Sequence, residues 1–153
     1  RDKLQNLFNL YTQGKLQKAL DDSKELLHEF PNSGILYNIN GTVNIGLQLF
    51  NEGMNSFRKA LKIKPDYVEV YNNMGIAFKD QGDQEKAIKS FKQVIEINPR
   101  FYEAYNNMGI ALKDQGDQEK AIKSFKQAIK IKPDFYEAYN NIGVVLKDLD
   151  SRA

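Results

Sequence analysis

Residues 68–101 read VEVYNNMGIAFKDQGDQEKAIKSFKQVIEINPRF, and residues 102–135 read YEAYNNMGIALKDQGDQEKAIKSFKQAIKIKPDF. The two stretches differ at only seven of 34 positions. The four prolines of the chain keep the same spacing of 34 residues, at Pro31, Pro65, Pro99 and Pro133. A fixed period of this length is typical of repeat proteins, in which each unit is one supersecondary element stacked on the next. The pattern therefore predicts an array of repeated units.

Each unit carries two helical patterns. In residues 68–101 the first pattern spans Glu69–Asp80, with apolar or small residues at helical spacing. A break follows around Gly82, and Asp83 is a good N-cap for a second helix from about residue 84 to residue 97. Pro99 ends that helix, because the residue before a proline avoids the α region. Each unit is therefore predicted to be a pair of helices.

The conserved spacing within the third unit identifies the kind of repeat. The matching columns are Tyr71, Met74, Gly75, Phe78, Ala87, Phe91 and Pro99. This pattern resembles the tetratricopeptide repeat (TPR), and it recurs in the other units. The resemblance implies an all-α fold, a right-handed α-solenoid of stacked antiparallel helix pairs. It implies about four and a half units in a single array over 1–153, namely 1–33, 34–67, 68–101, 102–135 and a half unit at 136–150.

The second unit departs from this pattern at three positions. Asn44 replaces a large apolar residue, Gln48 replaces the turn glycine, and Gly53 replaces an alanine. Glycine within a helix costs about 1 kcal/mol relative to alanine. We expect this unit to form the least stable junction of the array, and its first helix to end near Gly46.

Composition excludes several classes of function. Hydrophobic residues make up 41% of the chain and charged residues 27%, which is typical of a folded domain. The net charge of +2 gives no electrostatic reason to expect nucleic acid or a membrane surface as partner. There is no cysteine, which fits a cytoplasmic location, and His28 is the sole histidine. We expect no enzyme activity, cofactor or metal site, and a protein or peptide as partner.

Asparagines recur on the predicted first helices. The resemblance implies that these helices line the concave surface. The predicted peptide-binding residues are Asn38, Asn72, Asn106, Asn140, Asn73, Asn107, Asn141, Ile76, Ile110, Lys79, Lys113 and Lys147. An amide both donates and accepts hydrogen bonds, which suits the backbone of a peptide. The alternative is that the asparagines were copied with the repeat, or that they bond between neighbouring helices.

The asparagine columns are similar to those in the TPR arm of O-GlcNAc transferase, where they hold the main chain of a peptide. They are less similar to the two-carboxylate clamp of the Hsp70/Hsp90 co-chaperones, which needs asparagine or arginine in place of Ile76, Ile110 and Val144. The lysines of the second helices form a separate basic stripe. It comprises Lys86, Lys89, Lys92, Lys120, Lys123 and Lys126. We interpret this stripe first as a solubilising face, and only second as a nucleic-acid contact, because aromatic residues are not interleaved with it.

Three functions fit the sequence. The first is a scaffold that binds a peptide segment of a partner protein in the concave groove. The second is the substrate-recruiting arm of a larger enzyme, resembling a glycosyltransferase or a sulfotransferase, which would continue beyond Ala153. The third is self-association through the uncovered last helix and possible homo-oligomers, with Tyr139, Ile142, Val145 and Leu146 as the contact residues.

Overall fold

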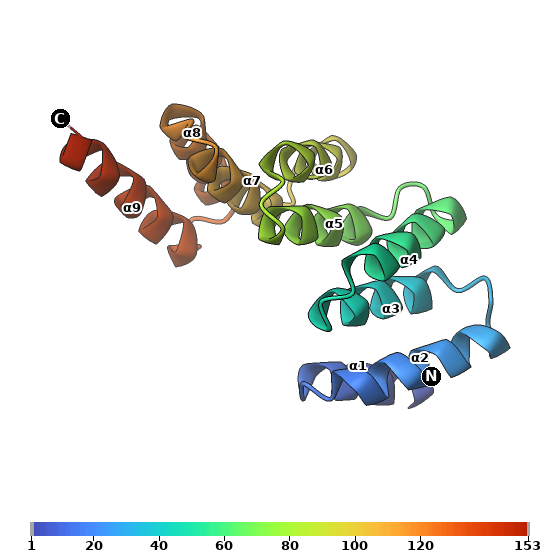
Figure 1. Cartoon of the computed structure of the whole chain (residues 1–153). Helices are drawn as coiled ribbons and strands as arrows, with labels where there is room; N and C mark the ends of the chain where they lie inside the picture. Colours follow the sequence, from blue (N-terminus) through green and yellow to red (C-terminus); the bar gives the residue numbers. More distant parts are fainter. Residues whose placement is uncertain (1, 153) are drawn as a thin grey trace. The chain divides into compact units, whose positions relative to one another are not determined.

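The structure is a computed structural model that describes residues 2–152, and this part of the chain is all α. Within it the helices are α1 (Asp2–Thr12), α2 (Leu16–Glu29), α3 (Gly34–Gly46), α4 (Phe50–Ile63), α5 (Val68–Asp80), α6 (Gln84–Ile97), α7 (Tyr102–Asp114), α8 (Gln118–Ile131) and α9 (Tyr136–Arg152) (Figure 1). The helices α3, α5, α7 and α9 begin 34 residues apart. The helices therefore repeat with the period of the sequence, and α5 and α6 match their predicted ranges within one residue.

The contacts divide the chain into two compact units, each larger than one repeat: the first ends at Val70 and the second starts at Tyr71. From here on we call these two compact units the first unit and the second unit, and we call the repeats helix pairs. The first unit contains α1–α4, and the second contains α5 from Tyr71 onward together with α6–α9. Within each unit, helices that follow one another in the chain pack side by side, as in a helical-repeat solenoid. The prediction of one array over residues 1–153 stays a prediction.

The turn inside each helix pair needs a left-handed backbone. Gly14, Gly82 and Gly116 have φ values of 74°, 83° and 92°, a region that glycine enters without steric cost. The next helix then starts from an aspartate cap in the second unit. Asp83 accepts a hydrogen bond from the backbone N–H of Lys86, and Asp117 does the same from Lys120. Glycine and aspartate together therefore set the boundary between the two helices of a pair.

The core of a pair is built from a glycine on the first helix and a phenylalanine on the second. A Cβ atom on Gly75 would lie 2.5 Å from the ring of Phe91, and one on Gly109 would lie equally close to Phe125. Both rings are fully buried. The missing side chain is what allows the two helices to approach.

The first helix pair reverses this arrangement. Leu7 lies at the position equivalent to Gly75, and Ser23 lies at the position equivalent to Phe91. Both side chains are buried. The large residue has moved to the first helix and the small residue to the second, so the pair keeps a similar core volume.

The second pair has a polar core where the later repeats are apolar. Asn40 donates to the hydroxyl of Ser23 at 2.9 Å, and its amide oxygen accepts from Ser56 at 2.6 Å and from Asn44 at 3.0 Å. All four side chains are buried. Asn44 is therefore not a defect in an apolar core, since it belongs to a buried hydrogen-bond network between α2, α3 and α4.

The end of α3 and the glycine at position 53 also have a physical account. The helix α3 ends at Gly46, as predicted. A Cβ atom on Gly53 would lie 2.6 Å from the side chain of Ile45, so this glycine makes room for an isoleucine. The expected cost of Gly53 in a helix is therefore offset by packing, and the low stability of the junction stays a prediction.

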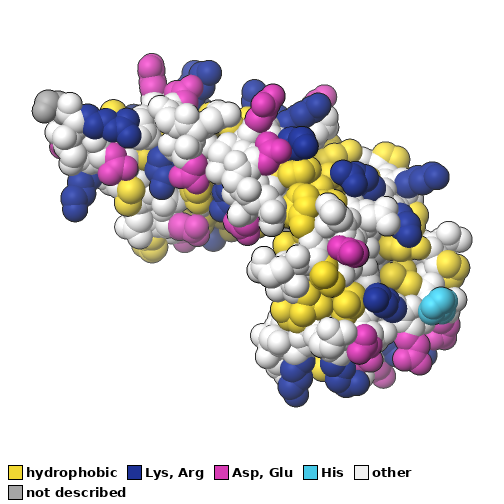
Figure 2. Space-filling model, viewed as in Figure 1, with side chains coloured by type: hydrophobic (Ala, Val, Ile, Leu, Met, Phe, Trp, Pro, Cys, Tyr) yellow, Lys and Arg dark blue, Asp and Glu magenta, His cyan; other side chains and the backbone are white. Residues whose placement is uncertain are grey.

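Both units expose large hydrophobic side chains. Figure 2 shows hydrophobic side chains gathered on the visible face of α1–α4, and basic and acidic side chains interspersed over α7–α9. The exposed large hydrophobic residues among residues 2–152 are Phe8, Phe30, Ile35, Leu49 and Ile63 in the first unit, and Ile97, Tyr136, Tyr139, Val144, Leu146 and Leu149 in the second.

Candidate functional site

The predicted peptide-binding residues of the second unit lie on its first helices, α5, α7 and α9. A helix turns by about 100° per residue, so residues spaced by four and seven positions share one stripe. On α7 that stripe contains Asn106, Ile110 and Lys113. We call the equivalent stripes of the three helices the first-helix face. It comprises Asn72, Ile76 and Lys79 on α5, the three residues of α7, and Asn140, Val144 and Lys147 on α9.

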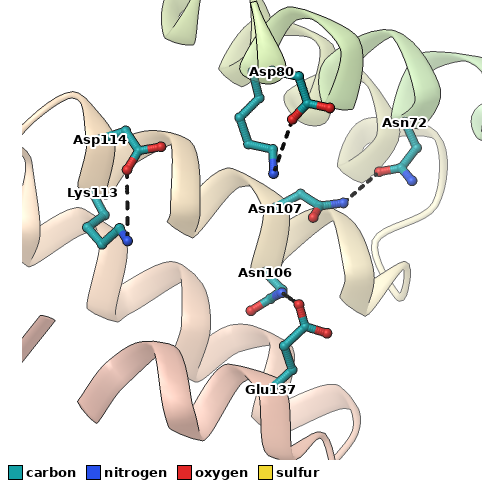
Figure 3. A network of polar contacts seen from close by, with 8 residues as sticks. Asn72, Asp80, Asn106, Asn107, Lys113, Asp114 and Glu137 are labelled. Atoms are coloured by element: carbon teal, nitrogen blue, oxygen red, sulfur yellow. Dashed lines mark hydrogen bonds and ion pairs between the residues drawn. The ribbon is translucent and has the colours of Figure 1, made fainter. Parts of the chain in front are cut away.

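Amide groups connect consecutive first helices. The side-chain N–H of Asn107 donates to the amide oxygen of Asn72 at 3.4 Å (Figure 3). The same bond recurs one repeat later, from Asn141 to Asn106, at 2.9 Å. Each of α5, α7 and α9 carries two adjacent asparagines. The partners in each bond are 35 residues apart, so the second asparagine of α7 bonds the first asparagine of α5, and the second asparagine of α9 bonds the first asparagine of α7. We call this arrangement the amide ladder.

Asn106 lies inside the ladder. Its side chain is only 2% exposed, and its N–H donates to a carboxylate oxygen of Glu137 at 3.2 Å (Figure 3). Its amide oxygen accepts from Asn141. These contacts correspond to the second interpretation of the asparagines, bonds between neighbouring helices. The prediction that Asn106 touches a ligand directly therefore needs correction, because its side chain is covered and its bonds are made within the protein.

The other residues of the face differ in how accessible they are. Asn140 and Lys147 are exposed, whereas the other predicted asparagines of this unit apart from Asn106 are half-buried, namely Asn72, Asn73, Asn107 and Asn141. Ile110 is half-buried and packs against the core of Phe125, while Val144 is 47% exposed. Of the apolar column, Val144 is therefore the residue most open to a ligand.

Two lysines of the first-helix face, Lys79 and Lys113, each form an ion pair with the aspartate that follows in the sequence. The ammonium of Lys79 lies 4.0 Å from the carboxylate of Asp80, and that of Lys113 lies 3.8 Å from Asp114 (Figure 3). The side chains of Lys79 and Lys113 are only 19% and 28% exposed, whereas those of Asp80 and Asp114 are 63% and 41% exposed. The two lysines are therefore half-buried on this face, and their aspartate neighbours are the more accessible members of each pair.

Asn38 belongs to the first unit, on α3. Its side chain forms a hydrogen bond with Tyr67. Burial raises the pKa of Tyr67 above 10.0, the bond to Asn38 opposes this, and the negative charge of Glu69 adds to the increase. The local role of Asn38 thus differs from that of the asparagines in the ladder.

The predicted self-association residues of α9 fall into two groups. Tyr139 and Leu146 are 48% and 49% exposed, and Ile142 is half-buried. Val145 is fully buried in one cluster with Phe125. Its inclusion in an exposed contact surface was wrong, because it lies on the side of α9 that packs against α8.

Neither a cluster of metal-binding side chains nor a helix able to span a membrane occurs among the described residues. Between residues 2 and 152, no group of three histidine, cysteine, aspartate or glutamate side chains is placed to hold a metal ion. His28 is exposed near the end of α2. None of the helices in this part of the chain is long and apolar enough to cross a bilayer.

Comparison with known proteins agrees with the helix-pair architecture. The family model described as "TPR repeat" matches residues 50–82, 75–116 and 111–150. The fold is that of a helical-repeat protein, a class that generally serves as a scaffold for other proteins and not as a catalyst. The chain belongs to the tetratricopeptide repeat family. No curated protein matches its sequence significantly.

Solved structures share the fold. A crystal structure of MamA is 25% identical, with a TM-score of 0.80 over 93% of this chain and 83% of that one. Pseudomonas aeruginosa PilF is 16% identical, with a TM-score of 0.88 over 98% of this chain and 68% of that one. The first TPR of Spaghetti (RPAP3), bound to the HSP90 peptide SRMEEVD, is 17% identical, with a TM-score of 0.72 over 76% of this chain and 93% of that one.

Proposed function

We propose that this chain, a protein-interaction scaffold of the TPR family, binds a peptide segment of a partner along the first-helix face of α5, α7 and α9. The observation that carries the proposal is the amide ladder. The bonds from Asn107 to Asn72 and from Asn141 to Asn106 orient a row of amides along one face. Side chains already held in place lose less entropy when a ligand binds, which favours affinity.

The ladder retains hydrogen-bonding capacity. An asparagine amide has two N–H donors and an oxygen with two lone pairs. The bond from Asn107 to Asn72 uses one donor of the first and one lone pair of the second. The main chain of an extended peptide presents N–H and C=O groups that suit such amides, whatever its side chains are.

Magnitudes indicate what else a ligand has to provide. A net hydrogen bond contributes about 0.5–1.5 kcal/mol, so four or five give roughly 2–7 kcal/mol before ordering costs. Micromolar affinity corresponds to about 8 kcal/mol. The peptide therefore also needs carboxylates for Lys79, Lys113 or Lys147, or an apolar side chain against Val144. The RPAP3 domain supports the general mode, since a TPR fold there holds a peptide.

A library of short random peptides displayed on phage provides the test, followed by anisotropy titration of each selected peptide. The face variant combines Lys79→Ala, Lys113→Ala and Asn140→Ala, and it spares the buried Asn106. The matched control combines Lys126→Ala, Lys130→Ala and Gln93→Ala, which are exposed positions on the second helices. We expect the face variant to bind about tenfold or more weakly and the control to bind normally. Peptides that bind the face variant with wild-type affinity would sink the proposal.

A further inference from the structure

The second unit has an open groove on a different side from the first-helix face. The groove lies over α7 between α6 and α8 and has a volume of about 1040 Å³. Its floor contains Tyr105, Met108 and Leu112 of α7. Asn106, Ile110 and Lys113 form a different stripe of the same helix, because successive residues are rotated by about 100° around the helix axis. We call this site the second-helix groove.

Lysines line both walls of the second-helix groove. They are Lys86, Lys89 and Lys92 on α6, and Lys120 and Lys123 on α8. Only two carboxylates, those of Asp83 and Glu85, are part of the same lining. The whole chain carries a net charge of only +2, so positive charge is concentrated at this site. All five lysines are exposed.

The local ion pairs do not neutralise these walls. Lys86 lies 3.6 Å from Asp83 and Lys120 lies 3.3 Å from Asp117, and the lysine side chains remain 65% and 72% exposed. Such pairs contribute little to stability because water screens them. A ligand carboxylate could replace either aspartate as a partner at a small cost.

The floor of the groove is apolar and only partly covered. Tyr105, Met108 and Leu112 are half-buried, and Ile88 of α6 lies beside them. Methionine is an adaptable surface for apolar ligands because its side chain is flexible and polarisable. A cylinder about 10 Å across would fill 1040 Å³ over about 13 Å, which suits a short peptide segment.

We propose that the second-helix groove binds a short acidic segment of a partner protein. The large apolar side chains of this segment lie on Met108 and Leu112, and the carboxylates of the segment lie between the two rows of lysines. Charge complementarity and the apolar floor both favour a peptide. A nucleic acid fits less well, because stacking needs exposed aromatic rings, and Tyr105 is the sole aromatic residue of the lining and is half-buried. The site is separate from the peptide-binding face proposed above.

The test uses the full chain and three labelled synthetic peptides in anisotropy titrations. The probe has Leu or Phe at every third or fourth position among Asp and Glu. One analogue replaces Leu and Phe by Ser, and the other replaces Asp and Glu by Lys. We expect saturable binding of the probe, about tenfold weaker binding of the first analogue and no binding of the second. Failure of the probe to saturate, or equal binding of the serine analogue, overturns the proposal.

Protein variants locate the site. The groove variant Lys89→Glu with Lys123→Glu should lose about tenfold or more in affinity for the probe. The control Lys126→Glu with Lys130→Glu changes the net charge equally on the same exposed surface, outside the groove lining, and should bind normally. A second groove variant, Lys92→Glu with Lys120→Glu, repeats the test if the first loses helicity. Equal losses in groove and control variants, or full competition by single-stranded DNA, contradict the proposal. The face variant with Lys79, Lys113 and Asn140 replaced should keep its affinity for the probe, so the two proposals can fail independently.

Discussion

Gln48 holds the same left-handed backbone conformation that Gly82 holds one repeat later, with φ values of 66° and 83°. Gln48 follows Leu47, the C-cap of α3, and it is the one residue other than glycine with positive φ among residues 2–152. A side chain in this region brings Cβ close to the following carbonyl oxygen, at a cost of roughly 1–2 kcal/mol. The turn of the second pair is therefore kept by the surrounding fold against the preference of its own residue.

The variant Gln48→Gly should be more stable than the wild type. Glycine removes the steric cost of the left-handed turn, although it loses more entropy on folding, and we expect a net gain of about 1 kcal/mol. The measurement is the free energy of unfolding from urea denaturation followed by circular dichroism. The reciprocal change Gly82→Gln should destabilise by a similar amount. A loss of stability in Gln48→Gly would show that the glutamine side chain itself supports the turn.

The glycine column allows a matched comparison between a crowded and an open site. Gly75 and Gly143 occupy equivalent positions on α5 and α9, yet an added Cβ meets the ring of Phe91 in the first and nothing within 4 Å in the second. We expect Gly75→Ala to lose about 1–3 kcal/mol through overpacking. We expect Gly143→Ala to gain up to about 1 kcal/mol from helix propensity. Thermal unfolding of both variants measures the difference, and equal shifts in the melting temperature would contradict the packing argument.

The helices could be predicted from the sequence because their boundaries depend on local chemistry. Gly82, Asp83 and Pro99 act within a few residues of their own positions, and α6 accordingly spans the predicted range. Gly75 and Phe91 recur 34 residues later as Gly109 and Phe125, so the sequence alone shows that this pair of residues is repeated. Such features need no knowledge of how one helix pair is placed on the next.

The candidate site was less predictable because it depends on contacts between repeats. Alignment placed Asn72 and Asn106 in one column, but the hydrogen bonds connect residues 35 positions apart, so they join two different columns. The burial of Asn106 depends on Glu137 from the next repeat. Val145 is different, since its column contains Ala77 and Ala111, both buried, and the repeat itself indicates its burial.

Tyr67 should make stability depend on pH in the alkaline range. Its pKa in the folded protein is raised above 10.0, mainly by burial, so the phenol is favoured in the folded state. Below pH 10 both states hold the proton and this contribution to stability is complete. As the pH rises above 10 the unfolded chain ionises first, and the contribution is lost as the pH passes the folded pKa.

The variant Tyr67→Phe should therefore show a smaller loss of stability above pH 10 than the wild type. The readout is the free energy of unfolding at a series of alkaline pH values, and only its slope with pH matters, because the variant also loses the bond to Asn38 at every pH. Tyr136→Phe, at a site that is 73% exposed, serves as the matched control. Identical slopes for Tyr67→Phe and the wild type would contradict the assignment.

The polar core of the first unit gives the last prediction. Later repeats have Met74 and Met108 in the column of Asn40, so Asn40→Met brings the second repeat closer to its neighbours. We nevertheless expect this change to destabilise the protein. Methionine cannot replace the amide that bonds Ser23, Asn44 and Ser56. Ser23 and Asn44 keep a bond to a backbone carbonyl, whereas the hydroxyl of Ser56 loses the partner at 2.6 Å. An unsatisfied buried polar group costs about 1–3 kcal/mol.

A double-mutant cycle with Ser56→Ala separates the lost bond from changes in packing. Once the hydroxyl of residue 56 is removed, Asn40→Met no longer leaves it unsatisfied. The double variant should therefore be more stable than the sum of the single losses predicts, by about 0.5–3 kcal/mol. Urea denaturation of the four proteins gives this coupling energy directly. Losses that add within about 0.5 kcal/mol would mean that the bond between Asn40 and Ser56 contributes nothing, and that the polar core is tolerated without stabilising the unit.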